Sequence, residues 1–242
     1  MPLSNTLPGY RKLAIMQPYF FPYLGFFQLM AKADKFVLYD DVNFINRGWI
    51  NRNRIKINGA AHLITVPLHD ASQNKLICEI QISQDAVWKK KMLKTVAQAY
   101  ARAGCFDRAF RLVEEIIAYP SNDLADFLRN SLFKLRDYLG IETEIVESSR
   151  TYGNASLNGA ARIVDICVRE HASVYINAIG GMDLYACNEF ADKGLELYFV
   201  KPTLDRYAQD KTEFLPGLSI IDVIMHNDRP ALRNMLDSGV LL

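Results

Sequence analysis

Two short apolar runs on either side of one helical stretch constrain the fold of this chain more than any other feature. The first run is Leu13 to Met16, the second is Lys35 to Tyr39, and Phe21 to Ala33 between them has the pattern of a helix opened by Pro22. The second run, KFVLY, is apolar on both alternating faces, which is typical of a strand buried between two layers. The order therefore predicts a strand, a helix and a strand in a mostly parallel sheet.

The middle of the chain is predicted to be helical, and the alternation of strands and helices returns after it. Three helices are expected, at Trp88 to Ala103, Arg108 to Ala118 and Asp123 to Leu139, the last ended by Gly140. Other expected strands are Ala61 to Leu68, Glu142 to Glu147, Ser173 to Asn177 and Leu195 to Val200, and other expected helices are Leu157 to Glu170, Met182 to Lys193, a short one capped by Ser219 with Asp222 in a capping box, and Pro230 to Leu236. The fold class we expect is a HUP/Rossmann-like α/β fold, a mostly parallel sheet flanked by helices. Residues 1–242 form a single domain in this prediction, with 86–140 as a helical insertion or subdomain.

The aromatic-rich stretch Met16 to Met30 does not predict a membrane span. Gln17, Pro18, Pro22 and Gln28 interrupt it, and a spanning helix needs about 20 apolar residues in a row. The same prolines disfavour a secretion signal, although two basic residues precede the stretch and an Ala-Lys-Ala sequence follows it.

Composition narrows the class of protein further. The four cysteines lie far apart, as expected of thiols in a reducing cytosol, and the four histidines show no metal-ligand spacing. We therefore expect a cytoplasmic protein without a metal site. The formal charge of +1 gives no overall electrostatic case for binding nucleic acid or an anionic membrane.

Three predicted strands end in polar residues. Gln17 follows the first strand, Asp40 and Asp41 follow the second, and Asn177 ends a later one. Ligands bind beyond the carboxyl ends of strands in open parallel sheets, so these side chains are expected to converge on one crevice. Gly180 and Gly181 come next, where a helix start could hold a phosphate or carboxylate; the alternative is that they only permit a tight turn.

The two aspartates are expected to have different roles, because adjacent strand residues point to opposite faces. One faces the crevice as a general base, and the other anchors a loop. Asp40 is the preferred base because it lies nearest the predicted strand, and Gln17 is the third candidate for a catalytic role. The alternative is that both carboxylates pair with downstream arginines and hold a long loop in place.

The segment after the aspartates is rich in arginine and asparagine. Arg47, Arg52 and Arg54 could bind a diphosphate through guanidinium forks, and Trp49 between them offers a stacking surface for a base or sugar. Tyr19 and Tyr23 could stack in the same way from the first loop. The alternative is a solvated basic loop.

The stretch LAIMQPYFFPYLGFFQLMAKADKFVLYDDVNFINRGWINRNRI, followed by YINAIGGMDLY and FLPGLSIIDVIM, resembles the WbqC-like family of bacterial proteins. The resemblance runs from about Leu13 to Met225. It implies a role in surface-polysaccharide (O-antigen, lipopolysaccharide) synthesis, with transfer of an amino acid, glycine, onto the amino group of a deoxysugar nucleotide. The matching positions are Gln17, Tyr19, Tyr23, Gly25, Asp40, Asp41, Arg47, Trp49, Asn51, Arg52, Asn177, Gly180, Gly181, Tyr185, Ser219 and Asp222.

A second resemblance, at the level of the fold, is to the nucleotidylyltransferases with an H-x-G-H motif. In that group a strand leads through a proline-containing loop to the motif at a helix start, and here the corresponding residues are Tyr23-Leu24-Gly25-Phe26. Both histidines are missing, which speaks against ATP-adenylating chemistry.

These observations predict an acyl or aminoacyl transferase that forms an amide on a nucleotide-linked amino sugar. Its donor is either a carboxylate activated by ATP or a preactivated group, such as a carrier thioester or an aminoacyl-tRNA, the one nucleic acid considered as a partner. The alternatives are a non-catalytic sugar-nucleotide binding protein of the same pathway, and a nucleotidylyltransferase or ATP-dependent ligase.

Overall fold

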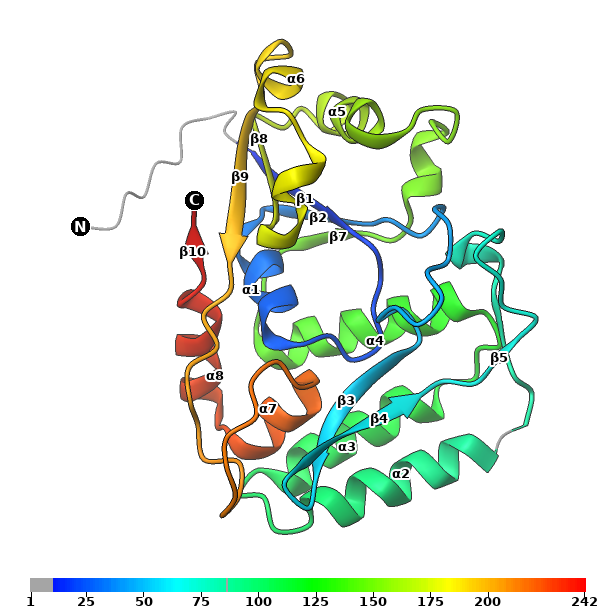
Figure 1. Ribbon diagram of the computed structural model, residues 1–242, viewed down its shortest axis with the longest axis vertical. Helices are drawn as coiled ribbons and strands as arrows, with labels where there is room; N and C mark the ends of the chain where they lie inside the picture. Colours follow the sequence, from blue (N-terminus) through cyan, green and yellow to red (C-terminus); the bar gives the residue numbers. More distant parts are fainter. Residues whose placement is uncertain (1–10, 86) are drawn as a thin grey trace.

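A six-stranded sheet forms the centre of the computed structural model, which describes residues 11–85 and 87–242 (Figure 1). The strands lie in the order β10-β9-β8-β1-β2-β7, and all neighbours are parallel except β10, which runs antiparallel to β9. Their bounds are β1 (Lys12–Met16), β2 (Lys35–Leu38), β7 (Glu144–Val146), β8 (Val174–Ala178), β9 (Glu196–Lys201) and β10 (Val240–Leu241). The predicted mostly parallel α/β sheet is confirmed.

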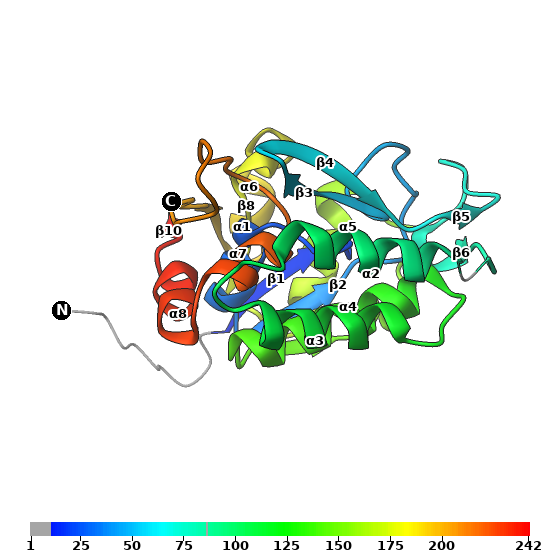
Figure 2. The ribbon, with the colours of Figure 1, turned by 90° about the horizontal axis from the view of Figure 1, so that it is seen from below.

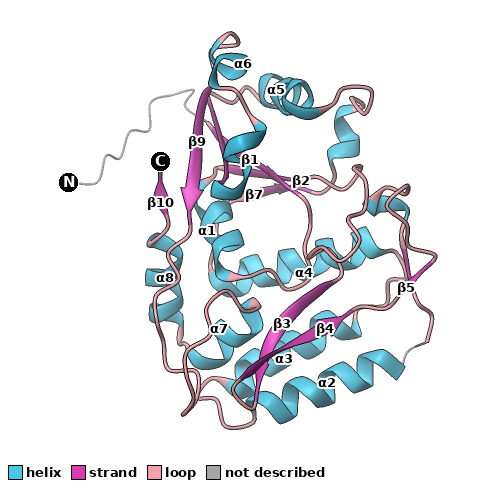
Figure 3. Ribbon diagram, viewed as in Figure 1, coloured by secondary structure: helices cyan, strands magenta, loops and turns pink. Residues whose placement is uncertain are grey.

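Helices cover both faces of this sheet (Figure 3). They are α1 (Leu24–Lys32), α2 (Val87–Tyr100), α3 (Phe106–Ala118), α4 (Leu124–Leu139), α5 (Gly159–Arg169), α6 (Cys187–Ala191), α7 (Ile220–His226) and α8 (Arg229–Asp237). Leu13 and Ile15 of β1 pack in one cluster with residues of α5 and α6, whereas Ala14 packs in a second cluster with α1 and α8. Alternate residues of β1 thus face two separate cores, which is why the run is apolar on both faces.

The strand order changes direction between β1 and β8. The chain leaves β1 towards β2 on one side of the sheet, and it leaves β8 towards β9 on the other side. A crevice outside the carboxyl ends of two such strands is the usual ligand site of open α/β sheets. This switch point therefore brings the predicted residues Gln17 and Asn177 to the same edge of the sheet.

The three predicted helices in the middle of the chain are confirmed as α2, α3 and α4, which run alongside one another beneath a β hairpin (Figure 2). The apolar stripe of α3 is buried, and α4 begins at Asp123, whose carboxylate accepts the Asp126 N–H. Gly140 ends α4 in a left-handed conformation, as predicted, with φ 69°. Residue 86, the expected start of the helical insertion, lies outside the described residues. No helix in the described ranges is long and apolar enough to cross a bilayer.

A hairpin of β3 (Arg52–Ile57) and β4 (Ala60–Thr65) stands where the sequence predicted a polar loop followed by one strand. Its turn is Asn58-Gly59, and both residues have positive φ, 50° and 78°. An Asn-Gly pair between strands is the preferred two-residue turn of a hairpin, and the polar residues of β3 hid this signal. A smaller pair, β5 (Leu68–His69) and β6 (Gln81–Ile82), was also not predicted.

The helices differ from the prediction in several details. The helix expected at Met182 to Lys193 is instead a 3₁₀ helix, η3 (Ile179–Leu184), followed by the short α6. Helix α1 begins at Leu24, because Phe21 adopts a left-handed φ of 41°. Ser219 does cap α7 by accepting the Ile221 N–H, but the Asp222 side chain does not complete a capping box.

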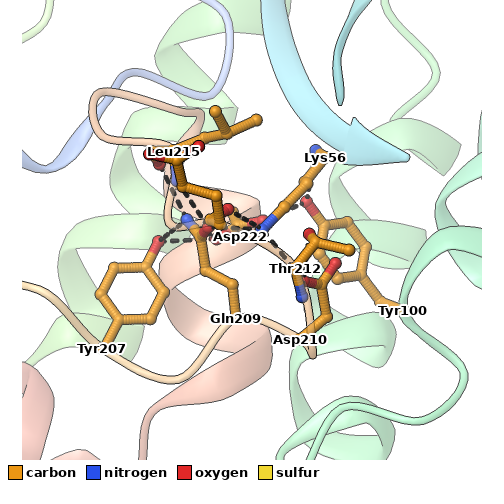
Figure 4. Close-up of polar contacts among 9 residues, drawn as sticks. Lys56, Tyr100, Tyr207, Gln209, Asp210, Thr212, Leu215 and Asp222 are labelled. Atoms are coloured by element: carbon orange, nitrogen blue, oxygen red, sulfur yellow. Dashed lines mark hydrogen bonds and ion pairs between the residues drawn. The ribbon is translucent and has the colours of Figure 1, made fainter. Parts of the chain in front are cut away.

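Asp222 instead lies at the centre of a buried polar network (Figure 4). Its carboxylate accepts hydrogen bonds from the hydroxyls of Tyr100 (2.8 Å) and Tyr207 (2.6 Å) and from Gln209 Nε2 (3.0 Å). The Tyr100 hydroxyl also accepts the Lys56 N–H at 3.2 Å. The network joins β3, α2, α7 and the segment after β9, which fixes the hairpin relative to the sheet.

Candidate ligand-binding cavity

A cavity of about 680 Å³ opens at the switch point of the sheet. Gln17 and Asn177 line it from the ends of β1 and β8, and Asn53 and Arg54 line it from β3. Its volume is in the range of sites that hold a drug-sized or cofactor-sized molecule. The hairpin and the carboxyl edge of the sheet therefore form the walls of one candidate binding site.

The aromatic loop between β1 and α1 forms a third wall. The carbonyl of Phe21 accepts hydrogen bonds from Asn53 Nδ2 at 2.8 Å and from Ser219 Oγ at 2.9 Å, and these two donors hold its left-handed conformation. The loop so fixed places Tyr19 and Tyr23 in the cavity wall, while the Phe21 ring is buried in the core. The rings of this loop thus serve both the core and the cavity.

Arg54 supplies the positive charge of the cavity. Its Cζ atom lies 5.2 Å from the centroid of the Trp49 ring, and Trp49 lines the cavity with 41% of its surface exposed. The Arg54 Nε atom is buried and has no hydrogen-bond partner among the described residues. No described lining residue carries a carboxylate, so this guanidinium is available to a ligand anion.

Two other predicted phosphate ligands do not line the cavity. Arg52 donates from Nε to the Gly48 carbonyl at 3.0 Å and from a terminal nitrogen to the Arg47 carbonyl. Arg47 is exposed and has a left-handed φ of 60°. Asn51, a further predicted ligand, donates from its side chain to the Val66 carbonyl at 2.9 Å and also lies outside the cavity lining. Arg52 and Asn51 hold the turn that presents Trp49.

The predicted catalytic aspartates also lie outside the cavity lining. Asp40 accepts a hydrogen bond from Ser148 Oγ at 2.7 Å, and Asp41 forms a buried ion pair with Arg162 at 2.5 Å. The Arg162 guanidinium lies 4.9 Å from the ring centroid of Tyr39, and Tyr39 does line the cavity. The aspartates are thus placed behind this wall, which corrects the expectation that all three polar strand ends share one hollow.

Burial changes the protonation preference of Asp40. Loss of solvation raises the pKa of its carboxyl, and the hydrogen bond from Ser148 and the charge of Arg150 offset this only in part. The residue is 3% exposed, and the neighbours of its carboxylate are the serine hydroxyls of residues 148 and 149. This environment is that of a carboxylate holding a loop.

Asn177 and Gly181 fit together at the end of β8. The Asn177 Oδ1 atom accepts the Ala178 N–H at 2.8 Å, which fixes the side chain against the strand end. A Cβ atom on Gly181 would lie 2.5 Å from Asn177 Nδ2, whereas a Cβ on Gly180 would meet nothing within 4 Å. Gly181 is therefore required by packing, and η3 is too short for its N-terminus to form an anion site by itself.

Four tyrosines complete the polar lining of the cavity. Burial raises the pKa of Tyr19, Tyr23, Tyr39 and Tyr185, so their hydroxyls are neutral donors at physiological pH. The described lining contains no histidine, lysine, cysteine or carboxylate. Elsewhere in the described ranges, no group of three or more histidine, cysteine, aspartate and glutamate side chains could hold a metal ion. The cavity can bind an anion, stack a ring and orient polar groups.

Sequence reasoning grouped Arg54 with Arg47 and Arg52 and could not separate them. The Asn58-Gly59 turn separates Arg47, which lies before the hairpin, from Arg52 and Arg54, which both lie in β3, but it does not distinguish the last two from each other. Tyr39 and Asn53 also line the cavity, although the sequence did not predict them as site residues.

The family model for the WbqC-like protein family matches residues 17–234. The chain belongs to the WbqC-like protein family. The matched range of this WbqC-like protein contains every residue that lines the cavity except Ile15 and Met16.

A Mycobacterium tuberculosis protein, the uncharacterized protein Rv1507c, is 26% identical to this WbqC-like protein over 218 residues. The alignment covers 89% of this chain and 94% of the relative. No solved structure matches the WbqC-like chain.

Proposed function

We propose that this WbqC-like protein binds a nucleotide-linked sugar in the cavity and acts in the cytoplasm in surface-polysaccharide (O-antigen) synthesis. The observation that carries the proposal is the pairing of Arg54 with Trp49. A guanidinium without a carboxylate partner suits a phosphate, and an indole beside it suits a base or a sugar ring. The tyrosine hydroxyls and the amides of Gln17, Asn53 and Asn177 supply donors and acceptors for sugar hydroxyls.

The topology supports a nucleotide ligand. Read from β7 to β9, the parallel strands lie in the order β7-β2-β1-β8-β9, the arrangement of doubly wound sheets that bind nucleotides at their switch point. A HUP/Rossmann-like relationship is part of the proposal for this reason. The position of the cavity agrees with it.

The reaction that the family resemblance implies is transfer of an aminoacyl group, such as glycyl, onto the amino group of the sugar. A preactivated donor suits the cavity better than ATP, because a single lining guanidinium matches a sugar diphosphate better than a triphosphate. The position of Asp40 and Asp41 behind the wall favours a second candidate, a non-catalytic sugar-nucleotide binding protein. Amide product, detected by mass spectrometry after addition of aminoacyl-tRNA or an aminoacyl thioester, distinguishes the transferase.

Thermal-shift measurements with a panel of nucleoside diphosphate sugars test the proposal, because a ligand of the native state raises the melting temperature. At least one sugar nucleotide is expected to stabilise the wild type. The shift should be lost in Arg54→Gln and kept in Arg47→Gln, a matched removal of charge outside the cavity. Absence of any shift, or a shift that survives Arg54→Gln, contradicts the proposal.

A further inference from the structure

The described lining of the cavity carries a positive charge and no negative charge. Arg54 is the charged residue among the described lining residues, and the rest of the lining is apolar side chains, amides and tyrosine hydroxyls. The tyrosines that face the cavity come from three segments, Tyr19 and Tyr23 before α1, Tyr39 after β2 and Tyr185 after η3, and burial keeps each of them neutral. A positively charged ligand group therefore has no counter-charge in the lining.

The nearest carboxylates offer no compensation. Asp41 is paired with Arg162, whose guanidinium also contacts the Tyr39 ring of the cavity wall. Asp40 is bonded to Ser148 and lies 3.8 Å from the Arg150 Nε atom. Each carboxylate behind the wall thus already has a cation beside it. Arg54 therefore determines the net charge of the described cavity lining.

We infer that the cavity admits the amino group of a sugar nucleotide only in its uncharged form. The inference rests on the proposed function and names the protonation state of the ligand. Desolvation disfavours an ammonium group, and the described lining offers no carboxylate to replace the lost hydration. On binding, the ammonium R–NH₃⁺ releases one proton to the buffer, and R–NH₂ enters the cavity.

This selection explains how an amine can be prepared for acylation without a carboxylate in the cavity. The nitrogen lone pair that attacks an acyl carbon is blocked in an ammonium and free in an amine. A site that binds only the amine supplies the nucleophile in its reactive state, and the proton has already left to solvent. Asp40 and Asp41 are then needed for the wall and not for proton removal.

The test compares two ligands that differ only at nitrogen, a nucleoside diphosphate hexosamine and its N-acetyl derivative, each with the same base. The pair is taken from a panel that covers uridine, guanosine and thymidine diphosphates, and affinities are measured by calorimetry from pH 6 to 9. Relative to the N-acetyl ligand, the amine is expected to weaken about tenfold for each pH unit below its own pKa. Calorimetry in two buffers of different ionisation enthalpy should show release of one proton per amine bound below that pKa.

The outcomes separate this inference from the proposed function. An affinity ratio that stays constant with pH, or amine binding without proton release, overturns the inference and leaves sugar-nucleotide binding intact. Binding of the N-acetyl ligands alone at every pH also overturns it. If no ligand of the panel binds, the proposed function fails and this inference fails with it.

A carboxylate placed in the lining should reverse the selection. Gln17 lines the cavity, and no hydrogen bond of its side chain is seen in the described part of the chain, so Gln17→Glu disturbs no polar contact there. The variant is expected to bind the ammonium form and to lose the pH-dependent ratio, while Asp40→Asn, behind the wall, keeps the wild-type ratio. A Gln17→Glu protein that binds the N-acetyl ligand and retains the wild-type ratio contradicts the inference.

Discussion

The Arg54 guanidinium lies over the Trp49 ring, with 5.2 Å between Cζ and the ring centroid. The two residues come from β3 and from the turn before it, and both line the cavity. The contact holds the guanidinium against a flat surface in the lining of the cavity, beside the space where a ligand anion would bind. Trp49 therefore reports on occupancy of the cavity.

Ligand binding is expected to change the fluorescence of one of the two tryptophans. Trp49 is 41% exposed at the cavity, whereas Trp88 packs on Phe127 in α4, 6.1 Å between ring centroids. A sugar nucleotide should quench the wild type and Trp88→Phe, and the quenching should disappear in Trp49→Phe. Quenching that persists in Trp49→Phe places the ligand elsewhere.

Two adjacent glycines are expected to differ in their tolerance of alanine. The Cβ of Gly181→Ala would lie 2.5 Å from Asn177 Nδ2 and must displace a buried side chain, at a cost of about 1–3 kcal/mol in unfolding free energy. Gly180→Ala meets nothing within 4 Å and should change stability by about 0.5 kcal/mol or less. Urea unfolding measures both. Equal effects of the two substitutions would show that the fit of Asn177 against Gly181 has been assigned wrongly.

The ion pair of Asp41 and Arg162 is expected to be important for stability. Both side chains are nearly fully buried, so Arg162→Met leaves a buried carboxylate unpaired and should lower the unfolding free energy by about 3–5 kcal/mol. Arg150→Met is the control, because Arg150 is 58% exposed and lies 3.8 Å from Asp40, and such a pair contributes at most about 1 kcal/mol. Chemical denaturation measures the unfolding free energy of both variants. A similar decrease in the two variants would argue against this assignment.

Asp40→Asn should be neutral or stabilising at pH 7. Burial raises the pKa of the Asp40 carboxyl, so the folded state carries an electrostatic cost above that pKa, and the cost disappears as the pH falls and the group is protonated. Asparagine keeps the oxygen that accepts from Ser148 and removes the charge. The stability difference from wild type should shrink between pH 7 and pH 4.

Thermal unfolding across that range measures this difference. A pH-independent loss of stability in Asp40→Asn would mean that the ionised carboxylate is required by the fold. If the same variant folds normally and loses amide formation, the predicted general-base role of Asp40 gains support.

We propose that the chain unfolds as a single domain, because the Tyr100 hydroxyl ties α2 to both β3 and α7 through Lys56 and Asp222. Tyr100→Phe leaves the buried Asp222 carboxylate with one donor fewer and should lower the unfolding free energy by about 1–3 kcal/mol in one transition. Tyr138→Phe on α4 is the control, since no hydrogen bond of that side chain is seen in the described ranges. Calorimetry that resolves two transitions would identify residues 86–140 as a separate subdomain.

The sheet and its helices could be predicted from the sequence because their signals are local. A strand apolar on both faces, such as Lys35–Leu38, and a glycine such as Gly140 after a helix leave little choice of conformation. The helix expected at Met182 to Lys193 is present only in part, as the end of η3 and the short α6, and the start of η3 depends on the non-local fit of Gly181 against Asn177. The Asn58-Gly59 hairpin was predictable and was obscured by the charged residues of β3.

The candidate site was harder to predict, because its chemistry depends on which polar groups already have partners. Arg52 and Arg54 are two residues apart, yet one is bonded to backbone carbonyls and the other faces the cavity. Asp41 follows β2 at the carboxyl edge of the sheet, where ligands are expected to bind. Arg162, 121 positions later in the chain, nevertheless pairs with it. Pairing over such separations has no local sequence signal.

The left-handed Phe21 is held by Ser219, which lies 198 positions further along the chain. During synthesis, the loop that carries Tyr19 and Tyr23 emerges from the ribosome long before the residue that fixes it. β1 and β2 are made early and can pair at once, but the wall of the cavity cannot take its final shape until Ser219 has been made. A nascent chain in which Ser219 has not yet been made therefore lacks the contact that completes this wall of the cavity.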